Sequence, residues 1–192
     1  IVGDKVSTQC PRIVAKHTLF AVFLQTEIDD SLCVVVLKAR ELVISRKRKY
    51  VKADGEDLNS IMVGIMQNKG SIHLNIGKPL TSEEVAAAAK CDKNDRYQLI
   101  RHAVDLRIIE GYKLWKNNYI AYDLLNHSFK YSDMYSPNDM EQFVEYMRTQ
   151  LDTVEPEINR EDLRRIFLEI YANPVVTKEL LAKEKSTGAI LL

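Results

Sequence analysis

The 192-residue chain is poor in the residue types that build disulfide frameworks and metal centres. Its three cysteines are Cys10, Cys33 and Cys91, an odd number with no Cys-x-x-Cys pair. This spacing argues against a disulfide scaffold and a zinc site, and it predicts reduced thiols in a cytosolic protein. No histidine pair or His/Asp/Glu cluster has the spacing of metal ligands. We therefore expect neither a metal nor a cofactor.

An excess of one charge and long apolar runs are also absent. The chain has 27 Lys and Arg against 27 Asp and Glu, so no overall basic field favours a nucleic-acid partner. No stretch approaches the roughly 18 apolar residues of a membrane span, and the first residues show no signal-peptide pattern. The glycines at 55, 64, 70 and 77 are isolated, which argues against a phosphate-binding loop. The first residue is Ile1 rather than Met, and we expect the chain to be a fragment.

The clearest local pattern lies in residues 70–80. Ile72, Leu74 and Ile76 alternate with polar residues, which predicts a half-buried strand with these three side chains on one face. A turn at residues 77–80 ends the strand. Thr81 and Glu84 then have the spacing of a capping box, which opens a helix. A strand that leads directly into a helix is typical of α/β proteins.

The sequence before this strand is compatible with more than one secondary structure. The apolar run at residues 32–37 precedes a helix-favouring stretch, so that a strand running into a helix and one continuous helix both fit. A second helix is predicted over residues 56–67. Its apolar residues follow an i, i+3, i+4, i+7 stripe and are Leu58, Ile61, Met62 and Ile65.

Helices dominate the sequence from residue 81 onward. We predict helices over 83–90, 96–115, from Pro137 to about 154, and from Asn159 to a stop at Pro174. Ser136 is the predicted cap of the helix that starts at Pro137. The helix at 96–115 has a wide apolar stripe that includes Tyr97, and it predicts burial against more than one neighbour. Overall we expect an α/β fold, with a partial mixed sheet in residues 1–80 and a mostly helical region in residues 81–192.

One basic cluster is the strongest candidate for binding. It spans residues 46–49 and continues to Lys52, and the residues proposed to contact phosphate or a membrane surface are Arg46, Arg48, Lys49 and Lys52. The alternative is a solvated loop whose charge is partly cancelled by acids at 54, 56 and 57. An aromatic-rich zone at residues 112–135 could likewise line an acyl groove or simply pack helices together.

Several runs, in order, resemble bacterial glycerolipid acyltransferases, the family related to 1-acyl-glycerol-3-phosphate acyltransferase. They are KAREL at 38–42, KYVK at 49–52, GEDLNS at 55–60, SIHLNIGKPL at 71–80, NYIAYDLL at 118–125 and IYANPV at 170–175. The resemblance covers residues 38–178 and concerns the C-terminal part of the family's proteins. It implies transfer of an acyl chain from a thioester to a glycerolipid hydroxyl in phospholipid biosynthesis, at the cytoplasmic face of the membrane.

The family's catalytic His-x4-Asp motif is not in this chain. At the position where the motif has its Asp, the chain has Val22 after His17, Lys78 after His73, Arg107 after His102 and Ser132 after His127. No catalytic residue is therefore assigned. The resemblance implies an acyl thioester, a glycerolipid acceptor and peripheral membrane contact as partners. The alternative is a helical protein-interaction module without chemistry of its own.

Overall fold

Three of the helices begin at a residue whose side chain caps the helix N-terminus. The computed structural model describes residues 22–26, 34–66 and 71–187. At α3 (Ser82–Ala89), the Thr81 hydroxyl accepts a hydrogen bond from the Glu84 backbone N–H, and the Glu84 carboxylate accepts one from the Thr81 N–H at 2.7 Å. Asp92 caps α4 (Lys93–Gly111), and Ser136 caps α6 (Pro137–Asp152) in a second capping box. The predicted caps at Thr81 and Ser136 are confirmed, because they depend only on contacts within one helical turn.

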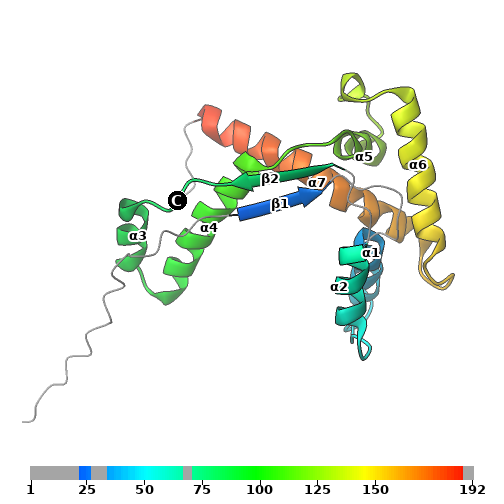
Figure 1. The fold of residues 1–192 in the computed structure, drawn as a ribbon, viewed down its shortest axis with the longest axis horizontal. Coiled ribbons are helices and arrows are strands. Elements are labelled where there is room, and N and C mark those ends of the chain that lie inside the picture. Colours follow the sequence, from blue (N-terminus) through cyan, green and yellow to red (C-terminus); the bar gives the residue numbers. More distant parts are fainter. Residues whose placement is uncertain (1–21, 27–33, 67–70, 188–192) are drawn as a thin grey trace, which may run out of the picture.

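The predicted α/β fold with a partial mixed sheet is wrong. Within the described residues, seven α-helices accompany two five-residue strands, β1 (Val22–Thr26) and β2 (Ile72–Ile76), which form one antiparallel ladder. Of the apolar run at residues 32–37, the described residues 34–37 belong to α1 (Val34–Ser45), so they add no strand. The protein is mostly helical, its longest described helix is α7 (Arg160–Thr187), and the small ladder contacts α4 (Figure 1).

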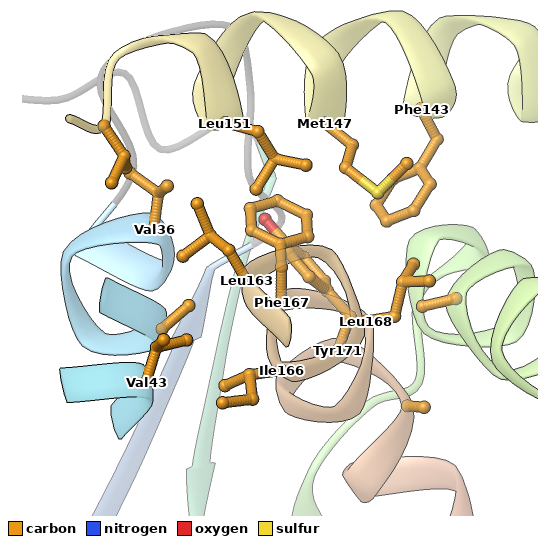
Figure 2. Close-up of a cluster of buried hydrophobic side chains, with 14 of the residues drawn as sticks. Val36, Val43, Phe143, Met147, Leu151, Leu163, Ile166, Phe167, Leu168 and Tyr171 are labelled. Carbon is orange, nitrogen blue, oxygen red and sulfur yellow. The ribbon is translucent and has the colours of Figure 1, made fainter. Parts of the chain in front are cut away.

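The hydrophobic core lies where three helices meet α7. They are α1, α5 (Lys116–Asn126) and α6, and Figure 2 shows labelled side chains of α1, α6 and α7 converging. Leu163 and Phe167 of α7 are fully buried against Val36 of α1 and Met147 of α6. Because α1 belongs to the same core as the C-terminal helices, the core spans residue 80. The division into 1–80 and 81–192 stays a prediction.

β2 faces the opposite way from the prediction. Ile72, Leu74 and Ile76 are exposed, whereas His73 and Asn75 are half-buried on the side of α4. The His73 Nε2 donates to the Gly111 carbonyl at 3.0 Å, and the Asn75 side chain occupies the space that a Cβ at Gly111 would fill. The polar face is therefore inside because the end of α4 offers it a carbonyl acceptor and room for an amide.

Two helices also depart from the sequence pattern. α7 continues through Pro174 to Thr187, although proline removes one backbone N–H. Side chains from the neighbouring segment bind carbonyls near this point: Asn118 donates to the Tyr171 carbonyl at 2.9 Å, and Tyr112 donates to the Pro174 carbonyl at 2.7 Å. α4 contacts more than one neighbour, as predicted, but its stripe is only partly buried, because α4 has no fully buried residue and Tyr97 is 63% exposed.

Candidate functional site

The candidate site is an elbow made by the end of α1, the loop at residues 46–55 and α2 (Glu56–Met66). We call residues 46–52 the basic loop. Tyr50 holds this loop to α1, because Arg40 donates to its hydroxyl at 3.0 Å and the hydroxyl in turn donates to Glu56. Glu56 also accepts from the Ala53 N–H at 2.9 Å, which orders the turn before α2. These hydrogen bonds fix the position of Tyr50 and of the turn that follows the basic loop.

Arg40 connects the elbow to the rest of the protein. Its guanidinium forms a bidentate salt bridge with Glu155, in the segment between α6 and α7. The Nε donates to Oε2 at 2.7 Å and the Nη2 donates to Oε1 at 2.6 Å. This contact raises the pKa of Arg40 and lowers the pKa of Glu155, since each charge stabilises the other. Burial, followed by its bond to Glu56, raises the pKa of the Tyr50 phenol, so it stays a neutral donor at physiological pH.

The predicted contact residues differ in how free their charges are. Lys52 bonds to Asp57, which raises the pKa of Lys52, and Arg46 lies 3.8 Å from Glu169. Among the described residues, Arg48 and Lys49 have no ion pair and both are exposed. Lys47, which is not among the predicted contact residues, is also exposed and has no ion pair within the described residues. The elbow thus offers three unneutralised cations in a row.

Two of the three acidic side chains in the elbow are hydrogen-bonded to other groups of the elbow. Glu56 accepts bonds from Tyr50 and from the Ala53 N–H, which lowers its pKa, and Asp57 bonds to Lys52. Asp54 is exposed in the turn before Gly55, whose φ of 79° suits glycine. The local cancellation expected from the acids is therefore incomplete, because two of the three are bound to groups outside residues 47–49.

The stripe on α2 faces outward. The side chains of the predicted stripe, Leu58, Ile61, Met62 and Ile65, are all exposed. Met66 beside them is exposed as well, and these five residues form the apolar face of α2. Glu56 and Ser60 are half-buried, and α2 contacts α1. The periodicity in the sequence predicted the helix correctly but did not show that its apolar side faces away from the protein.

The aromatic zone packs helices together. The Tyr131 ring contacts the rings of Tyr119 and Tyr122 at centroid distances of 5.0 and 5.1 Å, and the Tyr131 hydroxyl donates to Glu179 of α7. Buried Asp123 holds the loop that follows α5 through Ser128, Tyr131 and Tyr135. Phe129 is the exception, with 79% of its surface exposed.

No acid–base pair centred on histidine appears in the part of the chain that the structure describes. His73 bonds to a backbone carbonyl, and neither His102 nor His127 has a hydrogen bond or ion pair to a carboxylate there. His17 lies outside the described residues. Within the same ranges, no group of three or more His, Cys, Asp or Glu residues has the arrangement of a metal site, and none of the helices has the length and apolarity needed to cross a bilayer.

Comparisons with known protein families, with curated proteins and with solved structures find no match to this chain. The assignment of a function therefore depends on the residues and the geometry described above.

Proposed function

We propose that this chain is the C-terminal portion of a phospholipid-biosynthesis acyltransferase, and that its basic loop binds the phosphate of a glycerolipid acceptor. The observation that carries the proposal is the row of exposed, unneutralised cations Lys47, Arg48 and Lys49 on a loop held by Tyr50. Guanidinium and ammonium groups are the usual partners of phosphate oxygens. The ordered runs of residues 38–80 that resemble the acyltransferase family enclose this loop.

In the proposed reaction, the acceptor hydroxyl oxygen attacks the carbonyl carbon of an acyl thioester. The carbon–sulfur bond breaks, the thiol leaves and a base takes the hydroxyl proton. This chain lacks the His-x4-Asp motif that would supply the base. Its role is then to hold the acceptor at the cytoplasmic face of the membrane, and the chemistry requires another part of the protein.

Two measurements test this proposal. The purified chain, given a labelled acyl thioester and lysophosphatidic acid, should transfer no acyl group; measurable transfer would show that the chemistry does not require another part of the protein. Titration with glycerol 3-phosphate, followed by NMR, should shift backbone resonances of residues 46–52. The double variant Arg48→Gln/Lys49→Gln should lose these shifts, whereas exposed Lys90→Gln/Arg164→Gln should keep them. Equal shifts in both variants would exclude the basic loop as the phosphate site.

The second candidate is a protein-interaction module without chemistry. The exposed apolar face of β2 favours it, because Ile72, Leu74 and Ile76 are each more than half exposed. Sequencing of the DNA upstream of the Ile1 codon separates the two candidates. An in-frame His-x4-Asp motif supports the acyltransferase, and an unrelated domain or a stop codon supports the module.

A further inference from the structure

The geometry points to α2 as a membrane-docking helix: we infer that its apolar face lies in the interface of an anionic bilayer, with the basic loop over the lipid headgroups. This inference rests on the proposed function, because it names the surface at which the acceptor would be bound. It adds to the basic loop a second set of side chains that the phosphate contact does not use, namely the apolar face of α2.

The apolar face is continuous and wide. At 100° per residue, its five side chains fall within an arc of about 140°. Their exposed fractions run from 46% for Met62 to 78% for Met66. Val51, in the basic loop next to this helix, is 79% exposed as well. The elbow thus places one band of apolar surface and one row of cations in consecutive segments of the chain.

The orientation of α2 leaves this band uncovered. The side that is half-buried carries Glu56 and Ser60, which lie on the opposite side of the helical wheel from Ile65 and Leu58. A helix whose apolar side chains stay exposed leaves in water the surface whose transfer to an apolar medium is favourable. The helix is held in this orientation from its N-terminal end, where Tyr50 bonds to Glu56.

Charge complementarity favours an anionic bilayer as the occupant. The acids Glu56 and Asp57 at the start of α2 are bound to Tyr50, Ala53 and Lys52, while Lys47, Arg48 and Lys49 keep their charges free among the described residues. Anionic lipids attract clusters of this kind. With 11 residues, α2 is about 16 Å long, which suits a helix lying in the plane of the interface rather than across it.

The test is vesicle flotation of the full chain, comparing phosphatidylglycerol/phosphatidylcholine vesicles with phosphatidylcholine vesicles. We expect binding to the anionic vesicles only. Ile61→Gln/Ile65→Gln should lower the partition coefficient at least ten-fold, because two apolar side chains leave the interface. Arg48→Gln/Lys49→Gln should lower it about 25-fold, at roughly five-fold for each charge. The matched control, Val85→Gln/Leu180→Gln, replaces two exposed apolar residues on other helices and should bind as the wild type does.

A second readout locates the contact on α2. In an Ile65→Trp variant, brominated lipids in the anionic vesicles should quench fluorescence beyond the quenching of the wild type, whose single tryptophan is Trp115. Circular dichroism of each variant checks that the helices are retained. No added quenching, or wild-type binding by Ile61→Gln/Ile65→Gln, would overturn the inference.

The outcomes separate this inference from the proposed function. Glycerol 3-phosphate binding without vesicle binding would overturn the docking of α2 and leave the phosphate site standing. Vesicle binding through α2 without glycerol 3-phosphate binding would do the reverse. Self-association that Ile61→Gln/Ile65→Gln abolishes, in the absence of vesicle binding, would show that a second copy covers the face and would overturn the bilayer as its occupant.

Discussion

Replacement of the buried Asp123 is expected to destabilise the protein more than replacement of an exposed acidic residue. Asp123 is 1% exposed and accepts hydrogen bonds from the Ser128 hydroxyl at 2.6 Å, the Tyr131 N–H at 3.0 Å and the Tyr135 hydroxyl at 2.9 Å. These bonds tie the loop after α5 to the helix, and Asp123→Ala removes the acceptor for all three donors.

The expected cost follows from these contacts. Hydrogen bonds to a charged group contribute about 1.5–3 kcal/mol each, and the desolvation of the carboxylate offsets part of that gain. Because the three donor residues are only half-buried, water can replace some of the lost bonds. We therefore expect Asp123→Ala to lower the free energy of unfolding by about 3 kcal/mol, which in a chain of this size lowers Tm by about 6–12 °C.

Thermal unfolding followed by circular dichroism measures this change. The control is Asp133→Ala, in which an exposed acid of the same loop is removed; its Tm should stay within about 2 °C of the wild type. Asp123→Asn, which keeps the size of the side chain but turns an amide toward one donor, should lie between the two. A Tm for Asp123→Ala equal to that of Asp133→Ala would refute the reasoning that the buried carboxylate organises this loop.

Three further predictions concern other contacts. Gly111→Ala places a Cβ 1.8 Å from the Asn75 amide nitrogen and should lower stability by about 1–3 kcal/mol, with recovery in Asn75→Ala/Gly111→Ala; higher stability in the single variant would contradict the close approach. The pKa of Asp139 is lowered to about 2, first by Lys116 and then by the Ser136 cap. Its contribution to stability is therefore present above the unfolded pKa of about 3.8 and is lost as the pH falls toward 2. Acid unfolding of Asp139→Asn should lack this loss, and an unchanged pH profile would exclude it. A double-mutant cycle on Arg40 and Glu155 should give a coupling of about 0.5–1 kcal/mol that weakens with salt, because Glu155 is 50% exposed; a coupling above about 3 kcal/mol would contradict this picture.

The candidate site was only partly visible in the sequence. The sequence shows the row of cations because charge is a property of each residue, but it does not show that Lys52 is bound to Asp57 and that Lys47 is not paired among the described residues. The apolar face of α2 was recognised as a stripe, but a stripe shows only that a helix is amphipathic. Whether that stripe faces the core or the outside depends on the neighbour against which the other side packs.

The sequence by itself determined where α3 and α6 start. The caps at Thr81 and Ser136 need only a side chain and a backbone N–H three residues apart, and such contacts form in any tertiary setting. The same locality explains why the sequence predicts the strand β2 and its end at Ile76. Alternation of residue type is a property of the segment itself.

Only the tertiary structure decided what each element faces and where α7 ends. β2 turns its polar side inward because the end of α4 supplies the Gly111 carbonyl and space for Asn75. α7 passes Pro174 in a segment where side chains from Asn118 and Tyr112 bind the neighbouring carbonyls. These partners lie between 36 and 62 residues away along the chain, so no local pattern reports them, and the free energy of such contacts exists only once the helices have packed.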